Sequence, residues 1–272
     1  METKTICSDV LEELRCMPDC SVDAILTDPP YNISKENDNR DRSKLNSPIM
    51  RRESPLRYDF GEWDNMTRDD FLEFTKQWLK ECCRVLKDGG VIISFFNKED
   101  ISFLGWTTKE WGIRTRTIFT WCKSNPVPSF RKVNYLSATE FIWIGSKGTK
   151  AWTFNFKMQK EMKNYMITSN GSVYKETDHP TEKPEELIRY LLGIHTNEGD
   201  TILDCFMGSG TTGVACVNLK RNFIGIDKNV DYYNMATERI RKAKTQTQLS
   251  AESCPTESLI SVKRESADSP NS

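Results

Sequence analysis

The fold is indicated most clearly by one stretch, residues 201–213, TILDCFMGSGTTG. A β-prone run ends in Asp204, a glycine-bearing loop follows, and an apolar stretch compatible with a helix begins after Gly213. Glycines let a backbone approach a ligand closely, and a helix N-terminus offers unpaired N–H groups to a carboxylate or phosphate. The stretch therefore predicts a strand, a ligand-binding loop and a helix in succession.

The next β-prone run, residues 222–227, ends in a second acid, Asp227. In nucleotide-binding α/β folds, an acid about 20 residues past the glycine loop holds a ribose diol. We therefore expect Asp204 and Asp227 to bracket a nucleoside-like cofactor. Residues 208–213 also match G-x-G-x-x-G, a weak signal by itself, and no Lys follows as in a Walker loop. The preceding Phe206-Met207 pair suits a cofactor with a cationic, amino-acid-like end better than a pyrophosphate.

A second motif lies near the N-terminus, where the apolar run 22–27 (VDAILT) leads into Asp28-Pro29-Pro30-Tyr31. It places a carboxylate, a stiff backbone and an aromatic ring at the carboxyl end of a strand, where open α/β sheets bind ligands. Prolines donate no hydrogen bond, so their carbonyls can face a ligand. A buried carboxylate needs a donor, which the amino group of a nucleobase would supply. An ordinary turn is the competing interpretation, because Asp-Pro often begins turns.

Together the two motifs resemble those of the DNA amino-methyltransferases. Residues 27–31 look like the target-base motif of that family, and residues 204–213 look like its S-adenosylmethionine loop. Three further stretches match in order, namely 60–64 (FGEWD), 121–130 (WCKSNPVPSF) and 179–184 (HPTEKP). The target-base motif precedes the cofactor loop, as in the β-group of these enzymes. The resemblance covers residues 4 to 244 of the chain.

The resemblance implies transfer of a methyl group from S-adenosylmethionine to the exocyclic N6 amine of a flipped adenine in duplex DNA. The adenine would stack on Tyr31, and its amino group would donate to Asp28 and to the carbonyl of Pro29. The expected catalytic residues are Asp28, Pro29, Pro30 and Tyr31. The expected cofactor-binding residues are Asp9, Asp28, Lys183, Asp204, Phe206, Gly208, Ser209, Gly210, Thr211, Thr212 and Asp227. We expect no metal and no covalent intermediate.

Other functions stay open at this point. In the family, cytosine-N4 enzymes commonly have a Ser in place of the Asp, so Asp28 favours adenine over cytosine. An RNA or protein amide target is less favoured, because the basic, aromatic region described next suits duplex DNA. A nicotinamide-dependent oxidoreductase would explain the glycine loop but leave residues 28–31 without a role. A non-catalytic DNA-binding module with a decayed site conflicts with two intact motifs.

Charge is unevenly distributed along a chain whose net charge is only −1. Residues 109–175 hold twelve Lys or Arg against three Asp or Glu, interleaved with aromatic residues. This pattern suits a surface that pairs with phosphates and stacks on bases, although a solvated lysine-rich face is the alternative. We expect residues 129–178 or so to form an inserted target-recognition region. Phosphate contacts are expected from Lys147, Lys150, Lys157 and Lys160, and base contacts from Asn134 or Tyr135.

Strands and helices alternate along the chain, which predicts an α/β fold with a doubly wound, mostly parallel, Rossmann-like methyltransferase sheet over residues 1–245. Strands are expected at 5–7, 91–96, 118–121 and 141–144, and helices at 68–86 and 230–244. A helix over 10–14 would be capped by Ser8 or Asp9, and Asp9 is alternatively an adenine-binding residue of the cofactor site. Residues 34–57 are expected to be a mobile loop that orders on DNA, and 246–272 a disordered tail.

Cysteine and histidine usage argues against a metal centre. The nine cysteines contain no Cys-x-x-Cys pair, and the two histidines, His179 and His195, lie apart. We expect buried thiols at Cys82, Cys83, Cys205 and Cys216 in a reducing cytoplasm of a prokaryote or phage host. No apolar run reaches the length of a membrane span and no signal peptide is apparent, so no membrane partner is expected. The expected partners are double-stranded DNA, a second copy of the chain in a homodimer, and a cognate restriction endonuclease acting on the same site.

Overall fold

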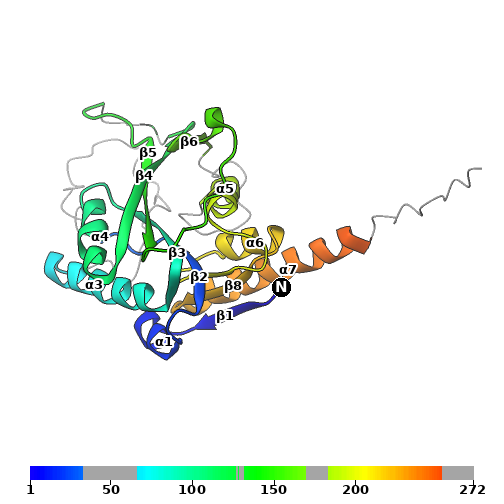
Figure 1. Cartoon of the computed structure of the whole chain (residues 1–272). Helices are drawn as coiled ribbons and strands as arrows, with labels where there is room; N and C mark the ends of the chain where they lie inside the picture. The colour runs from blue at the N-terminus through cyan, green and yellow to red at the C-terminus, as the bar shows by residue number, and fades with distance from the viewer. Residues whose placement is uncertain (33–65, 127, 129–131, 170–182, 253–272) are drawn as a thin grey trace, which may run out of the picture.

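The computed structural model describes residues 1–32, 66–126, 128, 132–169 and 183–252. It contains one eight-stranded sheet with the strand order β1-β8-β7-β2-β3-β5-β4-β6 (Figure 1). The strands are β1 (Thr3–Cys7), β2 (Val22–Thr27), β3 (Leu86–Phe96), β4 (Ile113–Lys123), β5 (Thr139–Lys147), β6 (Tyr165–Thr168), β7 (Thr201–Asp204) and β8 (Asn222–Asp227). The helices are α1 (Val10–Cys16), α3 (Arg68–Val85), α4 (Ile101–Thr108), α5 (Glu185–His195), α6 (Thr211–Asn218) and α7 (Val230–Glu252), with short 3-10 turns η4 (Lys109–Trp111) and η5 (Gln159–Glu161).

The sheet is mostly parallel, as expected. Among the described strands only β5 runs antiparallel, to β3 on one side and to β4 on the other. The chain leaves β2 toward β3 but leaves the adjacent β7 toward β8, so the winding direction reverses between β2 and β7. Such a switch point is where open α/β sheets bind ligands, because the loops that follow the two strands diverge there.

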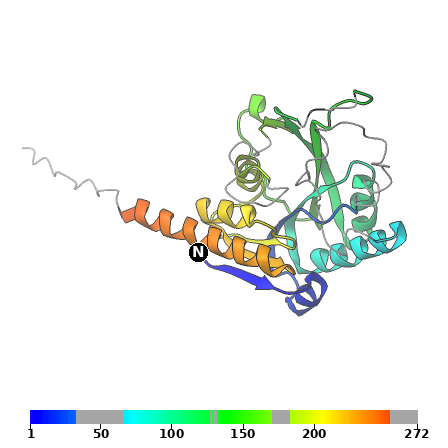
Figure 2. The ribbon, with the colours of Figure 1, turned by 180° about the vertical axis from the view of Figure 1, so that it is seen from behind.

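Helices cover both faces of the sheet (Figures 1 and 2). Alternate side chains of each central strand point to opposite faces. Leu26 and Ile93 pack with α5, α6 and α7, whereas the preceding residues, Ile25 and Ile92, pack with α1, α3 and α4. The central strands are therefore buried on both sides, which explains their continuous apolar sequences.

Helix α3 confirms the helix expected from residue 68. The Thr67 side chain accepts a hydrogen bond from the Asp70 N–H. Acidic residues occupy the first turn, where their negative charge interacts favourably with the positive end of the helix dipole. The chain enters β3 directly at Leu86, five residues before the expected start at Val91. Strands β4 and β5 are likewise longer than their apolar centres, because exposed residues at their ends continue the hydrogen-bonded ladder.

The C-terminal helix corrects one boundary. α7 continues to Glu252 and projects beyond the sheet in both views, so the expectation of a disordered tail from residue 246 is wrong for 246–252. Gln, Leu, Ala and Glu in this stretch are good helix formers, which lets a helix anchored in the core at Ile240 and Ala243 continue. The remaining tail, the loop 34–57 and the 60–64 motif lie outside the described residues.

The expected target-recognition region is built into the sheet itself. Its described part, 132–169, contributes all of β5 and the edge strand β6, which pairs in parallel with the carboxyl half of β4. Within the described ranges, no helix is long and apolar enough to span a bilayer. The four cysteines expected to be buried, Cys82, Cys83, Cys205 and Cys216, are buried free thiols.

Candidate active site

The two sequence motifs meet at the switch point. Strands β2 and β7 are hydrogen-bonded neighbours, and the Thr27 hydroxyl donates to Asp204 Oδ1 at 2.9 Å across a sequence separation of 177 residues. The loops that follow the strands line one cavity of about 780 Å³, a volume that suits a nucleotide-sized ligand. Of the expected site residues, the cavity wall includes Asp28, Pro29, Pro30, Tyr31, Lys183, Asp204, Phe206, Gly208, Ser209, Thr211, Thr212 and Asp227.

Two expected residues do not line this cavity. Asp9 caps α1, where its Oδ1 accepts from the Leu11 N–H at 2.9 Å, and its other oxygen lies 3.6 Å from Lys228 Nζ. Of the two roles left open for Asp9, the structure therefore shows capping. Gly210 adopts a left-handed φ of 79°, and a Cβ there would lie 2.8 Å from the Cβ of Ala236. Gly210 thus shapes the turn into α6 rather than the cavity surface.

The glycine loop is held by Asp227. Its Oδ2 accepts from the Gly208 N–H at 2.9 Å and its Oδ1 from the Asn229 N–H at 2.8 Å. Burial raises the pKa of the Asp227 carboxyl, and these two N–H groups partly oppose the shift. Asp227 therefore lies at the end of β8 with its carboxylate hydrogen-bonded to the glycine loop.

Asp204 has the more perturbed environment. Burial raises the pKa of its carboxyl to about 7, although hydrogen bonds from Thr212, Thr27 and the Phe206 N–H partly oppose the change. A cation placed in the cavity would return Asp204 to its charged form, because opposite charge favours ionisation. The buried acids and the close-approaching loop therefore fit a cofactor that carries a nucleoside and a positive charge, as S-adenosylmethionine does.

A second group of residues in the cavity wall is built around Asp28. Lys183 Nζ lies 2.5 Å from Asp28 Oδ2, and the Tyr31 hydroxyl donates to Oδ1. Burial, reinforced by the negative charges of Asp28 and Glu140, raises the pKa of Tyr31 well above its usual value and keeps the hydroxyl a donor. The Tyr31 ring is edge-on to Phe96, with centroids 6.3 Å apart, and lines the cavity where a base would stack.

Sequence reasoning missed three charged residues in the cavity wall, namely Lys98, Lys123 at the end of β4 and Glu140 at the start of β5. Lys123 Nζ and Glu140 Oε1 are 2.6 Å apart. The available signal was that Glu140 is one of only three acids in the basic stretch 109–175. His179 of the fifth motif lies outside the described residues, whereas Lys183 of the same motif reaches the cavity.

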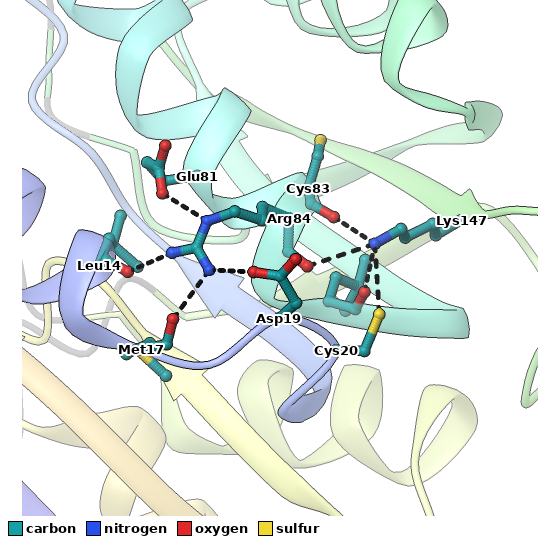
Figure 3. Close-up of polar contacts among 9 residues, drawn as sticks. Leu14, Met17, Asp19, Cys20, Glu81, Cys83, Arg84 and Lys147 are labelled. Atoms are coloured by element: carbon teal, nitrogen blue, oxygen red, sulfur yellow. Dashed lines mark hydrogen bonds and ion pairs between the residues drawn. The ribbon is translucent and has the colours of Figure 1, made fainter.

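The basic stretch does not form one surface, contrary to expectation. Because β5 is antiparallel, its last residue, Lys147, lies at the edge of the sheet opposite to Asp28. Lys147 Nζ donates to the carbonyls of Cys83 and Leu86, both at 2.6 Å, at the C-terminal end of α3 (Figure 3). Lys150 lies near the same edge, 3.9 Å from Asp88. The prediction that Lys147 contacts DNA phosphates is therefore wrong.

The aromatic residues of this stretch also divide into two groups. Trp121 and Trp143 are each 1% exposed and pack in the core, which excludes Trp143 from contact with a nucleic acid. Tyr135, 97% exposed, lies beside Asn134 in the cavity wall, and Phe156 and Tyr165 are also exposed. In the described ranges no group of three His, Cys, Asp or Glu residues is arranged to hold a metal ion.

The fold and the site define a class of protein, the Rossmann-like methyltransferases that act on an amino group. More particularly, the chain belongs to the DNA methylase family, whose model matches residues 22–238. This membership confirms the expected β-group DNA amino-methyltransferase that depends on S-adenosylmethionine.

Individual relatives agree over most of the chain. The type II methyltransferase M.HpaI of Haemophilus parainfluenzae is 31% identical over 258 residues, covering 88% of this chain and 74% of its own. The type II methyltransferase M2.DpnII of Streptococcus pneumoniae is 32% identical over 251 residues, covering 88% of this chain and 90% of its own.

Solved structures extend the likeness to the fold. The crystal structure of the M1.HpyAVI–SAM complex superposes with a TM-score of 0.66 at 29% identity, covering 88% of this chain and 98% of that chain. The cytosine-N4-specific PvuII DNA methyltransferase reaches a TM-score of 0.68 at 18% identity over 90% of this chain and 92% of its own, which shows the fold alone.

Proposed function

We propose that the chain methylates the N6 amine of an adenine that has been flipped out of duplex DNA. The observation that carries the proposal is one cavity whose wall contains Asp28 and the ring of Tyr31 together with Asp204 and the glycine loop. Chemistry on a base requires the base to leave the stack, and a cavity of this kind is where it would enter.

Around Asp28, the chain would make a poor nucleophile reactive. The lone pair of the exocyclic amine is delocalised into the ring, and acceptors on both of its hydrogens favour a pyramidal nitrogen with the lone pair out of the ring plane. Asp28 and the Pro29 carbonyl supply these acceptors, while Tyr31 holds the ring in position. Most of the rate is expected from this positioning. The nitrogen must finally lose a proton, and the Asp28 carboxylate is the group placed beside it.

Around the glycine loop, the chain would bind the cofactor, which when present supplies a methyl group on a cationic sulfur. The proposed binding residues are Asp204, Phe206, Gly208, Ser209, Thr211, Thr212 and Asp227 in the wall, with Gly210 shaping the loop. Lys183 is also proposed to bind the cofactor, because its ammonium lies in the wall between Asp28 and Glu140. Asp9 is kept as a candidate only through its position beside β8, whose last residue, Asp227, pairs with Cys7 of β1.

Adenine is proposed over cytosine because Asp28, rather than a serine, occupies the target-base position. The test is modification-sensitive sequencing of DNA from cells that express the chain, beside cells that express Asp28→Ala. N6-methyladenine in one sequence context, absent with the variant, is the expected result. N4-methylcytosine in its place would reverse the base assignment, and unmodified DNA from cells holding folded protein would overturn the proposed activity.

The relatives named type II methyltransferases also suggest a setting for this activity. We propose a cytoplasmic protein of a bacterium or its phage that protects its site from an endonuclease of the same specificity. Plasmids propagated with the chain should resist cleavage by that endonuclease. If no enzyme that cuts at the methylated sequence is blocked, the chain does not serve as a protecting partner.

A further inference from the structure

Four charged side chains form a continuous row across the wall of the cavity. Lys183 Nζ lies 2.5 Å from Asp28 Oδ2 and 3.4 Å from Glu140 Oε2, and Lys123 Nζ lies 2.6 Å from Glu140 Oε1. Two carboxylates and two ammonium groups thus alternate. The Lys183 and Lys123 side chains are only 10% and 13% exposed, so water screens these charges weakly.

The two carboxylates are not equally satisfied. Both oxygens of Asp28 accept a donor, one from Lys183 and the other from Tyr31. Glu140 Oε2 is buried and accepts no hydrogen bond from any described residue, although the Lys183 ammonium is within ion-pair distance. Burial by itself would raise the pKa of Glu140, but Lys183 and Lys123 lower it overall and keep the group ionised.

An ammonium bound to Asp28 competes with the proposed role of that residue. A target amine would share the negative charge of Asp28 with two donors already present, Lys183 and Tyr31. Positive charge also develops on the amine during methyl transfer, and an ammonium bound to Asp28 would oppose it, because stabilisation depends on unshared negative charge facing the reacting group. Within the described part of the cavity, the vacant acceptor nearest to Lys183 is Glu140 Oε2.

We propose that Glu140, held in place by Lys123, is a positioning residue that draws the Lys183 ammonium away from Asp28 when the target amine enters. This inference rests on the proposed DNA methylation and adds two residues, Glu140 and Lys123, to it. The short shift of an existing ion pair requires no further rearrangement, because Lys183 already lies between both acids.

The test compares the parent with Glu140→Gln, Lys183→Met and the double variant, with Glu110→Gln as a matched exposed control. Glu140→Gln keeps the size of the side chain but removes the charge that attracts Lys183. We expect single-turnover methyl transfer at saturating cofactor to fall about 10- to 100-fold in Glu140→Gln, as misplacement of a positioned group does. Removing the ammonium as well should recover most of that loss, so the double variant should be faster than Glu140→Gln alone.

A second readout needs no cofactor. A duplex with 2-aminopurine at the methylated position, identified by the sequencing experiment, brightens when that base leaves the stack. Glu140→Gln should weaken this signal and the double variant should restore it. A purely structural role for Glu140 predicts that both signals follow the melting temperatures of the variants, because removing both partners of a buried ion pair is milder than removing one. The proposal instead predicts the loss in a Glu140→Gln protein that melts like the parent.

The proposal is overturned if Glu140→Gln matches the parent in both readouts, or if the double variant is no better than Glu140→Gln. If thermal melting shows that Glu140→Gln does not fold, Lys123→Met is used in its place. Lys123→Met should lower the rate of methyl transfer by less than Glu140→Gln, and adding Lys183→Met should restore the rate. A parent that methylates DNA while the variants fail these tests refutes only the inference. A parent that leaves DNA unmodified refutes the proposed function, and the inference with it.

Discussion

Asp28 and Asp204 are the two residues whose environments set the proposed chemistry. Both are cavity-lining acids, yet Asp28 is ion-paired to Lys183, whereas Asp204 is held by neutral hydroxyl and N–H donors. Burial without an opposite charge disfavours the ionised form of a carboxyl, which is why the pKa of Asp204 is raised. The two acids are therefore expected to respond differently to substitution.

Asp28→Ala is predicted to abolish methyl transfer, by at least about 100-fold, because it removes the acceptor for the target amine. Cofactor affinity should be nearly unchanged, since the main cofactor contacts are proposed to come from the glycine loop, Asp204 and Asp227. Calorimetry with S-adenosylmethionine, beside a methyl-transfer assay, measures both properties. Loss of cofactor binding in a folded variant would place Asp28 in the wrong half of the site.

Asp204 is predicted to make stability depend on pH. Its pKa is about 7 in the folded protein against an ordinary value of 3.8, so the folded state binds a proton that the unfolded chain has released between these values. The free energy of unfolding should therefore decline as pH rises through this window, by about 1.4 kcal/mol per pH unit. Denaturant titrations of the parent and Asp204→Asn at pH 5 and pH 7 isolate this contribution. An equal pH dependence in the two proteins would contradict it.

At the scale of elements, the C-terminal ends of two helices are capped by cationic side chains from other parts of the chain (Figure 3). Arg84 donates to the carbonyls of Leu14 and Met17 at the end of α1, at 2.6 and 2.8 Å. Lys147 does the same at the end of α3 from the last residue of β5. Cations are favourable there because the final carbonyls of a helix are unpaired and carry partial negative charge.

Lys147→Met is predicted to destabilise the fold by roughly 2 kcal/mol, because it leaves charged hydrogen bonds at the α3 terminus unmade. Lys150→Met is the matched control. Its side chain is 73% exposed with one long contact to Asp88, so its effect should be within about 0.5 kcal/mol. Chemical denaturation measures both variants. Equal stability of the two would mean that the α3 cap contributes nothing measurable.

At the scale of the whole molecule, the basic residues of the stretch 109–175 lie in different places. Lys147 and Lys150 lie at the edge of the sheet away from the cavity, whereas Lys157 and Lys160 are exposed on the segment that runs beside α5 and leads into β6. The two pairs are therefore separate in the structure. Electrostatic attraction to a duplex should depend on the second pair, Lys157 and Lys160.

Neutralising Lys157 and Lys160 to Gln is predicted to weaken binding to all duplexes alike. The log–log slope of affinity against salt should fall by about one unit for each phosphate that the variant no longer neutralises. The matched variant, with Lys147 and Lys150 changed to Gln, should keep the slope of the parent. Equal log–log slopes of affinity against salt for all three proteins would mean that other residues pair with the phosphates. Basic residues within 34–57 would then be the next candidates for these contacts.

A homodimer is predicted in solution. Large apolar side chains are exposed on the described surface, including Trp106 on α4, which is 84% exposed. Such residues are enriched at interfaces between subunits. Sedimentation at micromolar concentration should give twice the mass of the chain, and Trp106→Ser should shift the equilibrium to monomers if α4 contributes. A monomer for the parent removes the prediction without affecting the site.

The sequence alone determined the two motifs, the alternation of strands and helices, and twelve residues of the cavity wall. Such features are local: Asp28-Pro29-Pro30-Tyr31 follows one apolar run, the glycine loop follows another, and each is set by neighbours a few residues away. The rule that parallel strands end at one edge then brings them together. The family followed from the same residues, because their identity and order specify the chemistry.

Only the tertiary structure decided the direction of β5 and which side chains surround Asp28. Strand direction depends on pairing with β3 and β4, which are distant in sequence, and no local pattern in 139–147 records it. That single antiparallel strand places Glu140 in the cavity and Lys147 at the opposite edge, although both belong to one basic stretch. Burial likewise depends on what packs against a side chain, which is why Trp143 lies in the core while Tyr135 is exposed.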